Sequence, residues 1–189
     1  MKDVYPFTLF FAFIVIQRIG ELMVAKSNEK WMKMQGALEF GGSHYRMIVL
    51  IHLLFFCSFL SEKVWFNHGL STIWPEIIGI FFLTQVLRIW AIASLGRYWN
   101  TKIIVLPNAK IVRKGPYRWI KHPNYVVVTL ELMMIPLLFN AYITTCLFTI
   151  LNMIVLRIRI PEEERALITL TEYDQVFNNC ERFFPKIVK

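Results

Sequence analysis

The densest group of residues able to do chemistry lies in segment 115–125, which reads GPYRWIKHPNY. A Gly-Pro turn opens the segment, Tyr117 and Trp119 offer aromatic faces, and His122 precedes a proline that suits the first position of a helix. The unpaired N–H groups of a helix start bind carboxylates, and aromatic faces attract cations. The segment is therefore a candidate site for a small ligand that carries both charges. The alternative is the ordinary belt of Tyr, Trp and Arg at a membrane surface.

A second polar group spans residues 157–165, which read RIRIPEEER. Arg159 and Glu163 are four residues apart, so they would share one face of a helix. The alternative is a solvated helix end held by salt bridges. Because the apolar stretch between the two groups fits a short helical hairpin, we expect the second group to return beside His122 on one membrane surface.

Apolar elements must position these groups. Hydrophobic types make up 56% of the 189 residues and charged types 18%, with a mean hydropathy of +0.48. This composition indicates a membrane protein and excludes a disordered chain. The three cysteines, Cys57, Cys146 and Cys180, are too few for a disulfide scaffold. We predict one domain over 1–189, with three membrane helices in 1–95, and a polar loop, a helical hairpin and a C-terminal helix in 96–189.

The predicted fold is an all-α integral membrane protein with about five transmembrane helices, the last two forming a hairpin. A spanning helix needs roughly 20 mainly apolar residues. The candidate stretches are Val4 to Val24, Tyr45 to Phe66, Ile73 to Leu95, Tyr125 to Phe139, and Ala141 to Leu156. The last two are short, and Pro136 is expected to kink or end the fourth. We also expect an amphipathic segment on the membrane from Trp31 to Glu39, and a charged cytoplasmic helix that begins near Pro161.

Basic residues predict the orientation of the chain. Segments 26–46, 96–122 and 157–189 would share one side of the membrane, and they hold 17 of the 21 Lys and Arg residues. The positive-inside rule then puts the C-terminus and both polar groups in the cytoplasm. Contact with anionic lipid headgroups accounts for the net charge of +8, so no nucleic-acid partner is needed.

Taken together, the two motifs resemble the signature of the isoprenylcysteine carboxyl methyltransferase family. The resemblance rests on GPYRW and KHPNY within 115–125, followed after the hairpin by EERAL at 163–167. The upstream half, with Gln17, Arg18, Glu21 and the GALE run at 36–39, is similar to short bacterial members. Some of these O-methylate alkylpyrones made by type III polyketide synthases.

The resemblance implies an integral membrane enzyme that uses S-adenosylmethionine and no metal. Glu163 would close the cofactor pocket from the far end of the hairpin, and Arg159, the proposed catalytic residue, would hold the anionic oxygen of the acceptor. A helix register slip of one residue would exchange Glu163 with Glu162 or Glu164. The chain departs from the family at Lys121, where Arg is common, and lacks the usual Phe-Gly step after residue 167. The cofactor pocket would be a cytoplasmic cradle made by segment 96–125 and the C-terminal helix. It would be lined by Val112, Tyr117, His122, Pro123, Asn124, Tyr125 and Glu163.

The expected reaction is O-methylation of a lipophilic acceptor, with the hydroxyl of an alkylpyrone as the favoured group. Such a hydroxyl is a vinylogous acid, so it arrives as an anion and needs no general base. His122 is the candidate base for an acceptor that arrives protonated. A prenylated cysteine carboxylate is the alternative acceptor. A different class of function is a small transporter or scaffold, with Arg18, Arg88 and Glu131 along a solute path. A membrane reductase would need a nicotinamide site, and no Gly-rich dinucleotide motif is present.

Glu131 carries a charge inside the fourth predicted helix, where it must face protein or water. It is expected to bind the acceptor, or to be a structural partner of Arg88 or Asn152. Arg18 and Glu21 are three residues apart, a spacing that favours an ion pair within the first helix.

Overall fold

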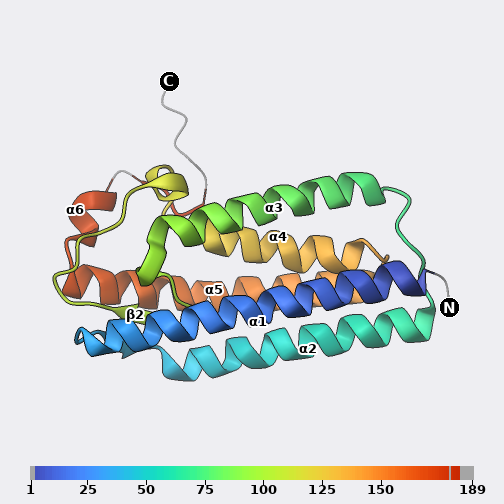
Figure 1. Cartoon of the computed structure of the whole chain (residues 1–189), viewed down its shortest axis with the longest axis horizontal. Coiled ribbons are helices and arrows are strands. Elements are labelled where there is room, and N and C mark those ends of the chain that lie inside the picture. Colours follow the sequence, from blue (N-terminus) through green and yellow to red (C-terminus); the bar gives the residue numbers. More distant parts are fainter. Residues whose placement is uncertain (1–2, 179, 184–189) are drawn as a thin grey trace.

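Five long helices run side by side in the computed structural model, which describes residues 3–178 and 180–183 (Figure 1). Four of them are long and apolar enough to cross a membrane, and α4 is shorter. This arrangement confirms the predicted all-α membrane fold. The helices are α1 (Val4–Met34), α2 (Gly42–Phe66), α3 (Trp74–Leu95), α4 (Pro123–Leu137) and α5 (Tyr142–Leu170), followed by the short α6 (Tyr173–Phe177).

The α4–α5 hairpin forms where the sequence predicts it. Pro136 lies in the last turn of α4, and Asn140 takes a left-handed conformation (φ 55°) that reverses the chain. The free N–H groups at the start of α5 are then capped from α2. The Glu62 carboxylate accepts hydrogen bonds from the backbone N–H groups of Ile143 at 3.0 Å and Thr144 at 2.8 Å. An acid at a helix N-terminus is also favoured by the helix dipole, so this contact fixes α5 against α2.

An aromatic core holds the end of the bundle opposite His122. The Phe7 ring of α1 packs edge-on against Phe59 of α2 and Phe139 after α4, with centroid distances of 5.2 and 5.1 Å. All three side chains are buried, whereas Leu9, Phe13 and other large apolar residues of the same helices are exposed, as expected for surfaces that meet lipid. The core therefore anchors the helices at one end and leaves the other end free to form a site.

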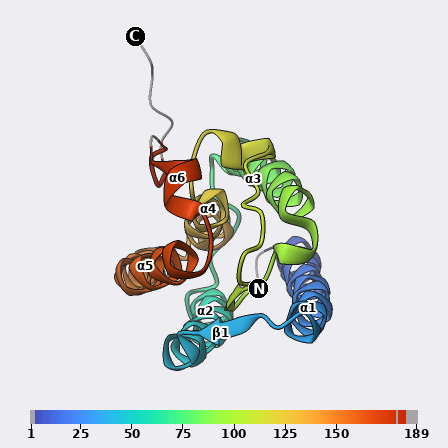
Figure 2. The same ribbon diagram turned by 90° about the vertical axis from the view of Figure 1, so that its left-hand side faces the viewer.

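A two-stranded antiparallel sheet closes the other end, and the sequence did not predict it. Strand β1 (Leu38–Phe40) pairs with β2 (Ile103–Val105), with Glu39 opposite Ile104. β1 lies across the gap between α1 and α2 (Figure 2). The expectation of a separate amphipathic segment over Trp31 to Glu39 was wrong, because α1 continues to Met34 and the chain turns at Gly36 (φ 89°) into β1.

The prediction that a new helix begins at Pro161 was also wrong. Pro161 lies inside α5, which continues without a break to Leu170. A proline in a helix interior frees the carbonyl four residues earlier, here that of Arg157. Both Pro161 and Arg157 lie on the exposed side of α5, where water or lipid headgroups can satisfy that carbonyl. The helix therefore carries Arg159 and Glu163 rigidly on one face beyond the hairpin.

Candidate functional site

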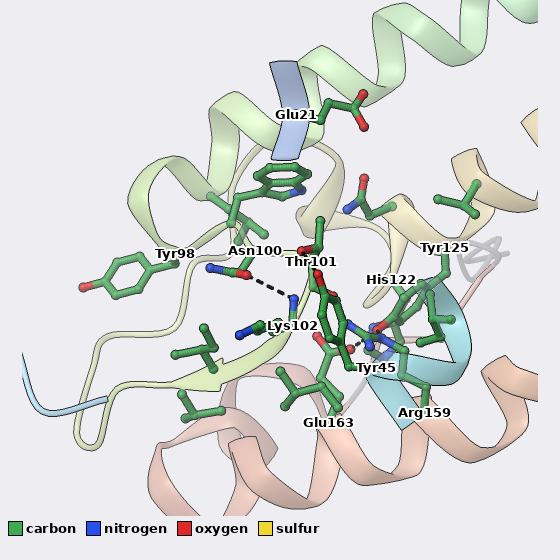
Figure 3. A pocket seen from close by; sticks show the side chains of 18 of the residues that line it. Glu21, Tyr45, Tyr98, Asn100, Thr101, Lys102, His122, Tyr125, Arg159 and Glu163 are labelled. Atoms are coloured by element: carbon green, nitrogen blue, oxygen red, sulfur yellow. Dashed lines mark hydrogen bonds between the residues drawn. The ribbon is translucent and has the colours of Figure 1, made fainter. Parts of the chain in front are cut away.

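A large cavity lies at the end of the bundle where α4 begins. Its volume is about 630 Å³, within the range of roughly 300–1,000 Å³ common for small-molecule sites. α1 and α2 form one side of it, α4 and α5 form another, and loop residues 98–112 cross between them. Side chains from all of these elements converge on it (Figure 3). The cavity thus joins the two polar motifs that the sequence singled out.

Two hydrogen bonds hold Arg159 in the wall of this cavity. Its Nε donates to the Tyr125 hydroxyl at 2.8 Å, and its Nη2 donates to the Thr101 carbonyl at 2.5 Å. The side chain is buried, and its Nη1 makes no hydrogen bond within the described residues. Tyr125 in turn donates to Glu163. Arg159 and Glu163 therefore share one face of α5, as their spacing predicted, with the Tyr125 hydroxyl between them.

The three consecutive glutamates have different surroundings. Glu163 lines the cavity. Glu164 points away from it: its Oε1 lies 3.0 Å from His122 Nε2, and its two oxygens accept from Arg182 at 3.0 and 2.6 Å. Glu162 lies against Gly41 beside β1. Of the three glutamates, only Glu163 belongs to the cavity lining. The register of α5 therefore turns Glu163 towards the cavity and the other two away from it.

A tight turn fixes Tyr117 at the cavity wall. Gly115 opens a 3₁₀ helix, Gly115–Arg118, with φ 57°. A Cβ at this position would lie 2.0 Å from the Ser94 hydroxyl of α3, so only glycine fits this approach. The turn buries Tyr117 against Ala91, Tyr173 and Phe177. Burial raises the pKa of the Tyr117 hydroxyl, and Glu163 nearby acts in the same direction, so this hydroxyl stays neutral.

Three residues of the cavity lining each carry a buried polar atom that has no hydrogen-bond partner in the described structure. These atoms are Asn124 Oδ1, Tyr173 Oη and Trp99 Nε1. Burial, with smaller effects from Glu164 and Glu163, raises the pKa of Tyr173, so its hydroxyl is a neutral donor or acceptor. A buried polar group without a partner costs about 1–3 kcal/mol. Such atoms indicate that the cavity is built for a polar ligand.

The inner part of the cavity reaches the middle of the bundle. Arg18, Glu21 and Arg88 line it there, among apolar side chains of α1 and α2. The predicted ion pair is present, with Arg18 Nη1 2.7 Å from Glu21 Oε2. Glu131 lies outside the cavity lining: it is 1% exposed and accepts from Arg18, Arg88 and Gln85. The geometry favours its structural alternative, with Arg88 as partner, whereas Asn152 bonds to Thr129 at 2.9 Å.

The other predicted site residues are distributed as follows. Val112, Tyr117, His122, Asn124, Tyr125, Arg159 and Glu163 line the cavity. Pro123 does not; it is buried as the first residue of α4, where it starts the helix that carries Asn124 and Tyr125. Within the described residues no group of His, Cys, Asp and Glu is arranged to hold a metal ion.

Comparison with known proteins identifies the family. The family model for isoprenylcysteine carboxyl methyltransferases matches residues 77–169, which contain most of α3, all of α4 and most of α5. The uncharacterized protein YpbQ of Bacillus subtilis is 49% identical over 161 residues, covering 85% of this chain and 96% of that protein. The chain belongs to the isoprenylcysteine carboxyl methyltransferase family. It is therefore a membrane methyltransferase. An uncharacterized protein of Haemophilus influenzae is 25% identical over 158 residues, or 83% of this chain and 92% of that protein.

The match contains both motifs that line the cavity, and it also contains part of the predicted 96–125 loop whose individual residues the sequence did not single out. Residues 99–106 follow α3 and cross the cavity; we call them the strap. Trp99, Thr101 and Lys102 of the strap line the cavity, and Thr101 holds Arg159. Lys102 ties the strap to Glu29 of α1 at 2.8 Å. The available signal was a polar interruption that contains a tryptophan, directly after an apolar helix.

Proposed function

We propose that this methyltransferase transfers a methyl group from S-adenosylmethionine to the anionic hydroxyl oxygen of an alkylpyrone-type lipid. The position of Arg159 is the observation that carries the proposal. On α5 it lies one turn from Glu163 and, in the other direction, one turn from the apolar Val155. All three residues line the cavity, so Arg159 stands at a junction of polar and apolar lining. A group at this junction can hold an acceptor oxygen while the acceptor's tail occupies the apolar part.

The polar part has the chemistry that S-adenosylmethionine requires. When bound, this cofactor supplies a methyl group already activated on a sulfonium, together with an ammonium, a carboxylate and a nucleoside. The Glu163 carboxylate and the faces of Tyr117 and Tyr125 attract cations. Asn124 Oδ1 and Tyr173 Oη can satisfy their missing hydrogen bonds on the polar groups of the cofactor. The buried walls exclude water, which favours transfer to the acceptor over hydrolysis.

Arg159 orients the acceptor without neutralising it. Two of its donors are occupied by Tyr125 and Thr101, so Nη1 remains for the acceptor oxygen. That oxygen forms the bond to the methyl carbon, while the pair of the carbon–sulfur bond stays on sulfur. No proton moves when the acceptor is an anion, and alignment supplies most of the catalysis. His122 is engaged with Glu164, which supports a positioning role for it and not that of a general base.

A prenylated cysteine carboxylate is the second candidate acceptor, and the family description favours it. It also presents an anionic oxygen on a long apolar tail. Genomic context separates the two cheaply: a type III polyketide synthase gene beside this one favours the pyrone, and a protein prenyltransferase in the same cell favours the cysteine. The transporter alternative has less support, because the family is one of methyltransferases and Arg18, Arg88 and Glu131 bind one another.

Calorimetry with the detergent-purified protein is the first test. S-adenosylmethionine and S-adenosylhomocysteine should both bind, and labelled S-adenosylmethionine should then transfer its methyl group to a 6-alkyl-4-hydroxy-2-pyrone. N-acetyl-S-farnesylcysteine serves as the competing acceptor. A folded protein that binds neither cofactor form would overturn the proposal. A protein that methylates only the cysteine compound would refute the pyrone assignment and keep the methyltransferase site.

We also propose that the cofactor end of the bundle faces the cytoplasm, because the basic segments lie there. Single cysteines introduced at Lys30, near the cavity end of α1, and at Asn67, near the opposite end of α2, would test this in whole cells whose native cysteines are replaced by serine. An impermeant maleimide should label position 67 and not position 30. The reverse pattern would invert the topology.

A further inference from the structure

Trp99 occupies a fixed position at the start of the strap. Its backbone N–H donates to the Gly96 carbonyl at 3.1 Å, and its carbonyl accepts from Asn28 Nδ2 at 2.7 Å. The next residue, Asn100, donates from Nδ2 to the Ala25 carbonyl of α1 at 3.0 Å. The bonds to Asn28 and Ala25 attach the strap to α1 next to the indole. The side chain is only 2% exposed and lines the cavity.

The indole N–H of Trp99 is buried and has no acceptor within the described residues. An indole N–H can only donate, so its partner must be an acceptor atom. Buried tryptophans usually have such a partner. Because the ring belongs to the wall of the cavity, the natural source of the missing acceptor is the molecule that fills it.

The position of Trp99 assigns that molecule to the acceptor and not to the cofactor. Thr101, which holds Arg159, is two residues further along the strap, so the two Cα atoms are at most about 7 Å apart. Between Trp99 and Thr101, Asn100 is bonded to the carbonyl of Ala25, one helical turn from Glu21, which lines the inner part of the cavity. Figure 3 shows Asn100 and Thr101 between Glu21 and the Arg159–Glu163 pair.

We propose that the Trp99 indole N–H donates a hydrogen bond to the ring carbonyl oxygen of a 4-hydroxy-2-pyrone while Arg159 holds its anionic 4-oxygen. This inference rests on the proposed function. The pyrone anion shares its charge between both oxygens, so methyl transfer could occur at either. With the carbonyl oxygen held by the indole and the 4-oxygen held by Arg159, the ring has one orientation, in which the oxygen at Arg159 faces the methyl donor. Trp99 is thus a residue that determines specificity: it selects the 4-methoxy-2-pyrone over the 2-methoxy-4-pyrone.

The atoms balance for either isomer. One oxygen–carbon bond forms, the methyl carbon–sulfur bond breaks, and the electron pair stays on sulfur to give neutral S-adenosylhomocysteine. The product is a neutral methyl ether, and no proton is transferred. The two products differ only in which oxygen carries the methyl group, so their ratio reports directly on the Trp99 contact.

The test compares the full-length wild-type protein with Trp99→Phe, which keeps an aromatic ring and removes the donor. Trp65→Phe is the matched control, because Trp65 is 82% exposed at the end of α2 away from the cavity. The substrate is a 6-alkyl-4-hydroxy-2-pyrone, and the isomers are separated chromatographically and identified by NMR. We expect Trp99→Phe to lower kcat/KM for the pyrone about 10- to 100-fold, to yield the 2-methoxy isomer, and to leave the Kd of S-adenosylhomocysteine unchanged.

Each other outcome has a defined meaning. A Trp99→Phe enzyme with wild-type kcat/KM and a wild-type isomer ratio overturns the assignment, since the indole N–H then makes no bond to the acceptor. A weakened Kd for S-adenosylhomocysteine would place Trp99 in the cofactor site and also overturns it. A wild-type enzyme that binds the cofactor but leaves the pyrone unmethylated refutes the proposed acceptor itself. If the Phe variant does not fold, benzothienylalanine at position 99 keeps the bicyclic ring and replaces N–H with sulfur.

Discussion

The three consecutive glutamates of α5 should respond differently to the same substitution by glutamine. Glu163 faces the cavity and accepts from Tyr125, Glu164 holds His122 and Arg182, and Glu162 lies outside both sets of contacts. The change is nearly isosteric at each position, so it removes a charge with little change in packing. We therefore expect one variant to lose cofactor binding, the next to lose stability, and the third to lose neither.

The contacts of each glutamate set the expected loss of cofactor binding or of stability. A hydrogen bond to a charged group contributes about 1.5–3 kcal/mol, so Glu163→Gln should weaken S-adenosylmethionine binding about 10- to 150-fold. Glu164→Gln loses its charge-assisted bonds to Arg182, whose side chain is 49% exposed, and to the buried His122. Solvent weakens the first pair, so we expect a total loss of about 1–3 kcal/mol of stability. Glu162→Gln should change neither quantity by more than about 0.5 kcal/mol.

Two measurements check this series. Calorimetry gives the Kd of S-adenosylmethionine, and thermal melting of the detergent-purified variants without ligand gives relative stability. Glu163→Gln should melt close to wild type yet bind poorly, whereas Glu164→Gln should melt lower and retain binding at a temperature where it is folded. Equal loss of binding in the Glu162 and Glu163 variants would show that the register of α5 does not choose the contact, and the reasoning would fail.

Three further predictions follow from other parts of the site. Arg159→Ala should lower kcat/KM about 10- to 150-fold with an unchanged cofactor Kd, measured against the exposed Arg157→Ala; an unchanged rate would reject the acceptor role. Gly115→Ala should lower stability in melting experiments by about 1–3 kcal/mol, because its Cβ would meet Ser94 at 2.0 Å, and wild-type melting would contradict this. A hydrogen bond from Lys33 is the main cause that lowers the pKa of Glu39. The Glu39 carboxylate therefore stabilises the fold at pH values above its pKa in the unfolded chain, about 4.3, and this contribution is lost as the pH falls through the lowered pKa of the folded state. The melting difference between wild type and Glu39→Gln should therefore vanish at acid pH, and a difference that persists there would refute it.

Much of the fold could be predicted because the membrane imposes a simple rule on sequence. Apolar stretches long enough to cross it become helices, since every backbone group must be satisfied within the segment. The hairpin at Asn140 followed from the short polar break between two such stretches. This rule predicts nothing about the parts of the helices that extend beyond the apolar stretches. Beyond them α1 and α5 continue as helices through charged residues up to Met34 and Leu170, and hydropathy gives no signal there.

The sequence predicted many of the residues of the candidate site but few of the contacts between them. Spacing indicated that Arg159 and Glu163 share a face, and the hairpin indicated that they return to His122. The sequence did not place Tyr125 between them, nor the strap that holds Arg159 through the Thr101 carbonyl. These contacts join segments more than thirty residues apart in the chain, and no local pattern encodes such a distance.

Glu131 shows where sequence reasoning reaches its limit. Charges inside a bilayer must be paired, so the sequence does predict a partner for this residue, but Arg88 and Asn152 were equally suitable on their position alone. The structure brings Glu131 together with two arginines. Arg88 Nε donates to it at 2.9 Å, and Arg18 donates both to it and to Glu21. Two positive and two negative side chains from α1, α3 and α4 thus form a neutral cluster beneath the cavity. Both carboxylate oxygens of Glu131 already accept hydrogen bonds, so the cluster joins three helices at the inner end of the cavity and Glu131 serves the fold.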